Sequence, residues 1–384
     1  MTKYIVKSGD TLYSIATRIL GNPALVGEIK KNNNLNSDNL KLGMELLLPV
    51  KTKPKSVTTN VPISVEQKTK SVPNNIESEP VPFLIGDKFY YKNENGTQIE
   101  IGSKRPKGIM RVGQLNPEKF AIENSALLNS LKLTSSEIKV LSGVSKNEGN
   151  LDAINSWDNA FFSWGMFQWT IGTLSAQGEL PALLKLIQSQ KPALFQTYFG
   201  KFGISISSVT SDITGFLTLD KQEVNNPTIK ERFRDPIWAM RFIQAGLNPE
   251  IASIQILFAV NRLNRFYFKN ETALGGVSLS KLLNSEYAVG LLLDNHVNRP
   301  AWVVPCVVKA IGELGLSFND LSNADDATEG LVIERYLQIR ETYQAPKSST
   351  KPMTHAKQRG EKIANSGLSK QRNSFLSGSK NRSV

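Results

Sequence analysis

Glu148 stands at the start of a segment whose residue types are unusual for this chain. Six of the thirteen residues from Trp157 to Trp169 are aromatic, against 8% of the whole sequence. Aromatic rings beside a carboxyl group withdraw water, which disfavours the charged form and raises the pKa of that carboxyl. A carboxyl that stays protonated near neutral pH is the general acid that cleavage of a glycosidic bond requires. The segment therefore indicates sugar chemistry, with Glu148 as the reactive group.

The residues before Glu148 predict a helix that ends close to it. Thr134 to Glu137 has the capping-box pattern that starts a helix, and apolar residues then recur at helical spacing. Gly149 is a natural helix terminator. We expect a helix over 135–147, so that Glu148 faces the negative end of the helix dipole. That position also raises the pKa of a carboxyl.

Two aspartates downstream are candidates for a second catalytic carboxylate. Asp152 and Asp158 follow Glu148 by four and ten residues. A second carboxylate can position a water molecule or stabilise an oxocarbenium-like transition state. Asp158 fits the cap of a turn equally well, because an aspartate side chain readily accepts hydrogen bonds from nearby backbone N–H groups. The pattern alone leaves both roles open.

The stretch from Glu148 to Gln168 resembles the lysozyme-like superfamily, which includes the lytic transglycosylases. In that superfamily the catalytic glutamate ends a helix, and in transglycosylases a Gly-Leu-Met-Gln-like turn follows. Here the turn Gly165-Met166-Phe167-Gln168 begins seventeen residues after the glutamate. Gly149, Asp158 and Ser163 instead resemble the corresponding residues of phage-type lysozymes. The resemblance implies a mainly helical domain, a glycoside hydrolase or lytic transglycosylase activity, and no cofactor or metal.

Polar and aromatic side chains near this segment are candidates for contacts with sugar. A second polar stretch, Asp294 to Pro300, lies between two apolar runs and is expected either to form a loop over the cleft or to be the entry turn of a helix near 298–314. The candidate sugar-contacting residues are Ser163, Trp164, Gly165, Gln168, Trp169, His296 and Asn298.

Residues 4–49 carry the signals of a strand, two helices and a closing strand. Their order, with YIVKSGDTLYSIA at the start and LKLGMELLLP at the end, resembles the LysM module closely. That resemblance implies binding of N-acetylglucosamine-containing chains in a groove between two loops. The residues implied to line the groove are Gly9, Asp10, Thr11 and Leu12 on one side, and Asn32, Asn33, Asn34 and Leu35 on the other. Helix capping by Asp10 and Thr11, and turn formation by the asparagines, are the alternative roles.

The sequence predicts a multidomain α+β protein in four parts. Residues 1–50 form the small βααβ module, and residues 51–82, rich in Lys, Pro, Ser and Thr, read as a disordered linker. Residues 83–346 form a mainly helical lysozyme-like domain that opens with short strands, among them a hairpin at Asn95-Gly96. We expect residues 347–384 to be a disordered tail.

Positive charge is concentrated in that tail. Residues 347–384 hold nine Lys and Arg and one acidic residue, whereas residues 83–346 hold 26 of each sign. Such a tail can bind an anionic polymer, a delivery apparatus or a nucleic acid. Because the charge is confined to an appendage, nucleic-acid binding is the weakest of these interpretations.

Composition excludes several other chemistries. Cys306 is the only cysteine, and His296 and His355 are the only histidines, so a multi-histidine zinc site and a Ser-His-Asp triad are poor interpretations. No apolar run is long enough for a transmembrane helix, and the first residues lack the apolar core of a signal peptide. We therefore expect synthesis in the cytoplasm and action at the cell wall or periplasm after non-classical release or injection.

The favoured prediction is a peptidoglycan hydrolase that cleaves the β-1,4 bond between N-acetylmuramic acid and N-acetylglucosamine. Glu148 is its general acid, and the LysM module tethers it to the glycan. One alternative is a non-enzymatic LysM-containing structural or assembly protein of a phage tail or contractile injection apparatus. The other is a chitinase or chitosanase.

Overall fold

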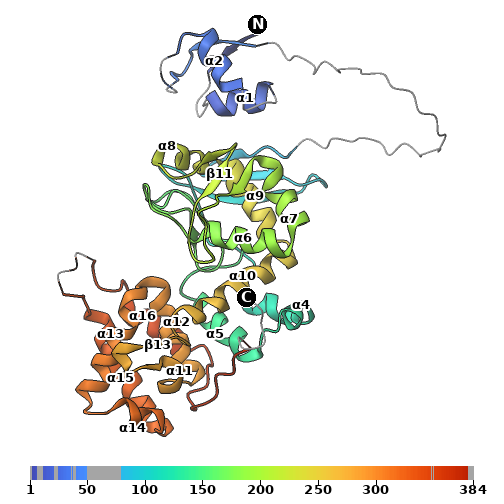
Figure 1. Ribbon diagram of the computed structural model, residues 1–384. Helices are drawn as coiled ribbons and strands as arrows, with labels where there is room; N and C mark the ends of the chain where they lie inside the picture. Colours follow the sequence, from blue (N-terminus) through green and yellow to red (C-terminus); the bar gives the residue numbers. More distant parts are fainter. Residues whose placement is uncertain are drawn as a thin grey trace, which may run out of the picture. The chain divides into compact units, whose positions relative to one another are not determined.

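The computed structural model describes residues 2–6, 12–20, 25–35, 37, 40–49, 79–346, 348 and 350–378. The chain divides into two compact units, Met1–Ile76 and Glu77–Val384, and each is described by itself (Figure 1). Residues 51–78 of the expected linker over 51–82 lie outside the described residues, as do Gly9, Asp10 and Thr11.

The first unit has the strand, two helices and strand that the sequence predicts. Strand β1 pairs antiparallel with β2, and Ile5 lies opposite Glu45. One face of each helix closes a small core that includes Ile15, Ile29 and Leu46. Its elements are β1 (Thr2–Ile5), α1 (Leu12–Leu20), α2 (Val26–Asn32) and β2 (Glu45–Leu48).

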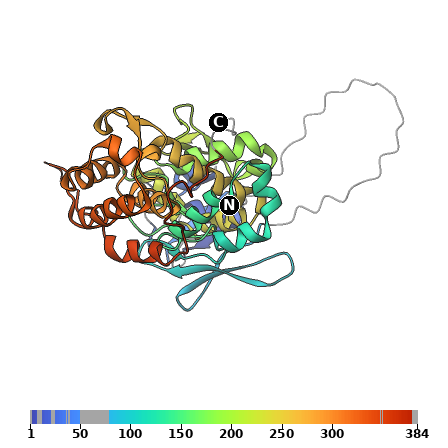
Figure 2. The same ribbon diagram turned by 90° about the horizontal axis from the view of Figure 1, so that it is seen from below.

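The second unit contains an antiparallel sheet in which each strand pairs with the next along the chain, from β3 to β9. The expected hairpin is present: Gly96 has φ +75°, and β4 pairs with β5 across it. Figure 2 shows this hairpin extending from the rest of the unit. The strands are β3 (Phe83–Ile85), β4 (Lys88–Lys92), β5 (Gln98–Lys104), β6 (Ile109–Arg111), β7 (Ile154–Asn155), β8 (Ser163–Trp164) and β9 (Trp169–Thr170).

Three helices are inserted between the paired strands β6 and β7, and this insertion positions Glu148. They are α3 (Pro117–Glu123), α4 (Ser125–Ser130) and α5 (Ser135–Ser145). Helix α5 starts with the expected capping box of Thr134 and Glu137. Because β7 must return to pair with β6, the end of α5 is drawn back to the sheet: the N–H of Asn150 donates to the carbonyl of Val112 at 3.3 Å.

Helix α10 runs through the middle of the second unit, with β11 and α6 to α9 on one side and β13 and α11 to α16 on the other (Figure 1). All of its residues from Ile251 to Val260 are buried, as expected for a helix that is apolar all round. The remaining helices before it are α6 (Leu180–Gln190), α7 (Pro192–Tyr198), α8 (Pro227–Lys230) and α9 (Pro236–Gly246), and α10 itself is Pro249–Asn261.

Smaller strands flank these helices. Strands β10, β11 and β12 form one antiparallel sheet, and β13 and β14 form another. Their bounds are β10 (Ile204–Ile206), β11 (Leu217–Leu219), β12 (Gln222–Glu223), β13 (Asn270–Glu271) and β14 (Val277–Ser278).

The polar stretch from Asp294 to Pro300 forms neither a loop over a cleft nor, at residues 294–298, the entry turn of a helix, which were the two alternatives. Residues 294–298 are the last turn of α12, a helix that the sequence interpretation did not predict, and the following helix begins at Val303 rather than near residue 298. The helices in this part are α11 (Leu279–Leu282), α12 (Glu286–Asn298), α13 (Val303–Glu313), α14 (Phe318–Ser322) and α15 (Asp326–Thr342).

The basic tail is folded over most of its length, so the prediction of disorder was wrong for residues 350–378. We call this segment the C-terminal strap. It contains helix α16 (Ala356–Ala364), which packs against α5, α12 and α15. Met353, Ile363, Leu368 and Phe375 are buried, and Ile363 and Leu368 join the main hydrophobic core. Within α16 the buried positions Ala356, Gly360 and Ile363 recur at helical spacing, although the segment is rich in Lys and Ser.

At the other end, the folded unit begins before the expected boundary at residue 83. Glu79 forms a two-bond ion pair with Arg241 of α9, with both N···O distances 2.7 Å.

Among the described residues, no helix is both long and apolar enough to cross a membrane.

Candidate active site

Glu148 lies just beyond the end of α5, close to its predicted place. Its N–H donates to the carbonyl of Ser145 at 3.1 Å, which continues the helix by a tighter turn. The side chain is 13% exposed. Its Oε1 accepts hydrogen bonds from Nδ2 of Asn298, at 2.9 Å, and from the guanidinium of Arg359. Three distant parts of the chain therefore meet at this carboxyl: α5, α12 and the strap.

Asp294 lies beside Glu148 and shares its arginine. Its Oδ1 accepts from Nη2 and Nε of Arg359 at 2.6 and 3.1 Å, and from Nδ2 of Asn147 at 3.1 Å. Its Oδ2 pairs with Nη1 of Arg340 at 3.2 Å, and both of those side chains are fully buried. The cluster thus contains two carboxylates and two guanidiniums, which balance in charge.

The surroundings of Glu148 favour its protonated form. Burial raises the pKa of this carboxyl above its usual range, and the neighbouring carboxylate of Asp294 adds to the rise. The guanidinium of Arg359 and the amide of Asn298 act in the opposite direction, because they stabilise the charged form. A carboxyl with a raised pKa has the property that the sequence predicts for Glu148.

Two residues of the 294–300 stretch, His296 and Asn298, were proposed to contact sugar. Of these two, only Asn298 lies against Glu148. Its Nδ2 also donates to the carbonyl of Asp294 at 3.2 Å, so the last turn of α12 orients it. The amide lies against the carboxyl itself, where it holds one oxygen of Glu148 in place.

Gln168 also lies close to the site, on the turn that follows β8. Its Nε2 donates to the carbonyl of Gly165 at 3.0 Å, so the Gly-Met-Phe-Gln turn closes on itself. A Cβ on Gly149 would lie 4.0 Å from this Nε2. Gly165 has φ +80°, and a Cβ there would lie 2.2 Å from Oε1 of Gln255, so only glycine fits. Gly165 therefore shapes the turn and makes room for Gln255 of α10.

Trp164 and Trp169 are core residues, and the prediction that they contact sugar was wrong. Both are almost completely buried. Trp164 packs edge-on against Phe242, with ring centroids 5.2 Å apart, and Trp169 packs against Phe258 at 5.6 Å. Ser163 is 3% exposed and is a paired strand residue. The side chains of Trp164 and Trp169 point from β8 and β9 toward α9 and α10. Trp157 is 40% exposed and is the most exposed aromatic residue of this segment.

Asp152 is a structural residue at the return from α5 to the sheet. Its side chain is fully buried and pairs with Arg111 at 2.7 Å. The other carboxylate oxygen accepts from the N–H groups of Gln114 and Leu115 at 2.7 and 2.8 Å. With both oxygens occupied and no exposure, Asp152 is not available to position a water molecule.

Asp158 caps the turn between β7 and β8. Its carboxylate accepts from the N–H of Ala160 at 2.8 Å and from Nδ2 of Asn155 at 2.8 Å. These contacts match the turn-cap alternative that the sequence left open. They do not include Glu148, so the structure gives no support to a catalytic role for Asp158.

His296 is a buried core residue and not a sugar contact. Its ring stacks on Phe266 with centroids 4.1 Å apart, and its Nδ1 accepts from Nε of Arg262 at 3.0 Å. Burial lowers the pKa of His296 to about 3, and the positive charges of Arg262 and Arg265 contribute to this. The imidazole is therefore neutral at any ordinary pH.

In the first unit, the candidate groove residues that the structure describes have different roles. Leu12 is 2% exposed and belongs to the core, so the prediction that it lines a groove was wrong. Asn33 joins the loop to β2: its Nδ2 donates to the carbonyl of Leu47, and its Oδ1 accepts from the N–H of Leu47. Asn34 is exposed with φ +50°, and Asn32 and Leu35 are half-buried.

Sequence reasoning missed Arg359, Arg340 and Asn147. Arg359 was assigned to a disordered tail, and Asn147 looked like part of a helix end. Arg340 carried a signal that could have been used, because it stands among Val332, Ile333, Tyr336 and Ile339, which are the buried positions of α15. A cation on an apolar helix face must find a buried partner.

Comparison with known proteins identifies the first unit alone. Residues 4–49 match the LysM domain family, which confirms that part of the prediction. LysM domains bind peptidoglycan and related N-acetylglucosamine polymers. Neither the curated proteins nor the solved structures compared with the chain yield a match. The second unit is therefore interpreted from its own residues.

Proposed function

We propose that the second unit is a glycosidase that acts on the polymer bound by the LysM domain. Its substrate is peptidoglycan, its reacting bond is the β-1,4 linkage between N-acetylmuramic acid and N-acetylglucosamine, and Glu148 is its general acid. The observation that carries this proposal is a largely buried carboxyl with a raised pKa at the end of a helix, in a chain that also carries a glycan-binding domain.

The contacts of the three acidic residues favour a mechanism in which Glu148 acts alone. Asp152 is committed to Arg111, Asp158 caps a turn, and Asp294 is fully buried against Arg340. In this mechanism Glu148 donates its proton to the glycosidic oxygen as the bond to C1 of the muramyl residue breaks. The resulting carboxylate then accepts the proton of the muramyl 6-hydroxyl, whose oxygen bonds to C1 and closes a 1,6-anhydro ring. The reaction consumes no water, as in a lytic transglycosylase.

Mass spectrometry of purified peptidoglycan after digestion tests this proposal. Fragments with 1,6-anhydro ends would support the mechanism with Glu148 alone, whereas reducing N-acetylmuramic acid ends would indicate hydrolysis with a second group that activates water. Digestion of chitin or chitosan in place of peptidoglycan would support the chitinase alternative. No fragments from any of these polymers, with either the wild type or Arg359→Gln and under conditions where the LysM domain binds them, would refute an enzymatic role.

One observation favours a second candidate function. Glu148 forms an ion pair with Arg359, which is also what a carboxylate in a purely structural network does. The chain would then be a LysM-containing structural or assembly protein whose second unit is held together by this cluster. Equal clearing of peptidoglycan by the wild type and by Glu148→Gln would support that alternative.

A further inference from the structure

The C-terminal strap covers the candidate catalytic carboxyl with a side chain of its own. Arg359 of α16 donates to Glu148 and to Asp294 through the same Nη2, and its own side chain is only 13% exposed. Glu148 is thus occupied by a cation from residues 350–378, a segment at the end of the chain. A glycosidic oxygen needs the same position and the same proton.

From this geometry we propose that the strap is an autoinhibitory element, which must lift from Glu148 before the glycan can enter. The proposal rests on the proposed glycosidase activity and adds its regulation. In the closed state Arg359 blocks access to the carboxyl and stabilises its charged form. When the strap lifts, the cluster loses one of its two cations, and the carboxylate of Asp294 then favours the protonated form of Glu148 that an acid catalyst needs.

Carboxylates of the body of the unit hold the strap at several points, in addition to its buried apolar residues and its other hydrogen bonds. Nη1 of Arg372 pairs with Glu329 at 2.8 Å. The N–H of Ser369 donates to Glu286 at 3.1 Å, and the N–H of Gly378 donates to Glu137 at 3.1 Å. Two cations of the strap, Arg359 and Arg372, therefore pair with carboxylates of the body on which it lies.

Two helix glycines allow the strap to lie close to the body. A Cβ on Gly143 of α5 would be 2.9 Å from Oγ of Ser366, and a Cβ on Gly290 of α12 would be 2.8 Å from Cδ1 of Leu368. Glycine inside a helix costs about 0.5–1 kcal/mol relative to alanine. The atoms nearest to these two glycines all belong to the strap, so the absence of a side chain there makes room for the strap.

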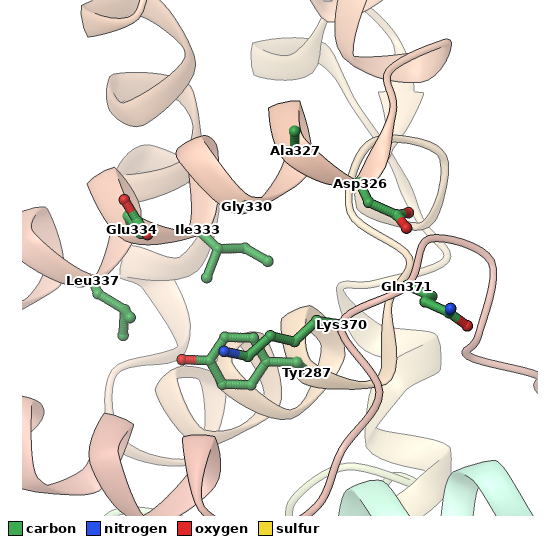
Figure 3. A pocket seen from close by; sticks show the side chains of 9 residues that line it. All are labelled: Tyr287, Asp326, Ala327, Gly330, Ile333, Glu334, Leu337, Lys370 and Gln371. Atoms are coloured by element: carbon green, nitrogen blue, oxygen red, sulfur yellow. The ribbon is translucent and has the colours of Figure 1, made fainter.

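One edge of the strap borders an open groove of the surface. A cavity of about 420 Å³ lies where residues of the strap meet α12 and α15 (Figure 3). Its lining includes Tyr287, Asp326, Ile333, Glu334, Lys370 and Gln371. Most of this lining is exposed to solvent, and only Lys370 and Gln371 of the strap take part, so close packing between the strap and the body is interrupted at this edge.

A reversible lock tests the proposal directly. The ideal Cβ position of Gly143 is 3.4 Å from Cβ of Ser366, close to the separation of a disulfide. We expect the double variant Gly143→Cys/Ser366→Cys to digest peptidoglycan when reduced and to lose at least about 90% of that rate when oxidised, because only the open fraction of the protein can react. Cys306 is buried and does not compete for the bond. Equal rates in the oxidised and reduced forms would overturn the proposal.

Two single variants separate the strap from the proposed chemistry. Arg359→Gln should raise the rate of digestion at least about tenfold, since losing one partner of a buried charge pair shifts such an equilibrium by that much or more. Lys357→Gln removes the same charge from an exposed position on the same helix and should leave the rate unchanged. A rate for Arg359→Gln no higher than that of Lys357→Gln would contradict the proposal.

A readout without catalysis keeps the two proposals distinguishable. Carbodiimide coupling of an amine to Glu148, located by peptide mass spectrometry, measures access to this carboxyl whether or not the protein is an enzyme. We expect coupling in the reduced double variant and protection in the oxidised one. If Glu148 is protected only in the oxidised double variant and no variant digests peptidoglycan, the glycosidase is refuted, but the proposal that the strap covers Glu148 stands. Coupling that is independent of the lock would refute the strap itself.

Discussion

Two carboxylate–arginine pairs lie four residues apart in the sequence, at Glu148 and Asp152, and they differ in where the arginine comes from. Asp152 pairs with Arg111 of the adjacent strand β6, and its side chain is fully buried. Glu148 pairs with Arg359 of the strap, and its side chain retains 13% exposure. The first pair joins β6 to the turn before β7 in the core, whereas the second joins the end of α5 to the strap, which we propose to lift.

The largest expected effect separates the roles of the acidic residues. Glu148→Gln should lower the rate of peptidoglycan digestion by about 10²–10⁴-fold, which is the usual contribution of a general acid. Asp158→Asn should retain the rate, because an asparagine oxygen also caps a turn. The rate of release of soluble fragments measures both. A comparable loss in Asp158→Asn would restore the mechanism that uses a second carboxylate.

The buried pair of Asp152 with Arg111 should contribute more to the free energy of unfolding than an exposed pair does. Asp152→Ala leaves Arg111 buried without its partner and should lower the free energy of unfolding by about 3–5 kcal/mol. Asp212→Ala breaks the exposed pair with Lys185 and should cost less than about 1 kcal/mol. Urea denaturation followed by circular dichroism measures both. A small effect of Asp152→Ala would show that the return of α5 to the sheet does not depend on this pair.

A third arginine cluster, at His296, predicts how stability depends on pH. The pKa of His296 is lowered to about 3 in the folded protein, so the unfolded chain binds a proton below its own pKa of about 6.5 while the folded chain does not. The contribution of His296 to the free energy of unfolding should therefore be fully present above pH 6.5. It should fall by up to about 1.4 kcal/mol per pH unit as the pH is lowered toward 3. His296→Gln should flatten this part of the curve in urea titrations at several pH values. An unchanged slope would contradict the assignment.

The smallest expected effect concerns the pH profile of digestion. A general acid is active while protonated, so activity is lost as the pH rises through the pKa of Glu148. Arg359 lowers that pKa, and Arg359→Gln should therefore move the alkaline limb of the profile to higher pH. Lys357→Gln is the matched control and should leave the limb in place. A shift toward lower pH would indicate that the limb reports another group.

Local patterns in the sequence predicted the elements around Glu148 well. The capping box at Thr134, the spacing of α5 and the glycine turn at Asn95-Gly96 each depend on residues within a few positions of one another. The LysM domain was recognisable for the same reason, since its strand, helices and strand follow in one short stretch. Signals of this kind survive in a single sequence because their physical cause is local.

The aromatic segment shows where local reasoning stopped. The concentration of rings drew attention to the right carboxyl, but Trp164 and Trp169 are core residues that pack on α9 and α10. Whether a ring faces sugar or core depends on which helix covers the strand. That helix lies some seventy to ninety residues further along the chain, and no spacing rule connects the two.

By itself, the sequence determined a glycan-binding LysM domain, a helix that ends near Glu148 and a set of strands joined by short turns, because each of these depends on neighbouring residues. Only the tertiary structure decided which residues contact Glu148. Asn298 reaches it from α12 across 150 residues, and Arg359 reaches it from the strap across 211. Burial of the strap's apolar face brings that arginine to the carboxyl, and the free energy of such burial is defined only by the folded chain.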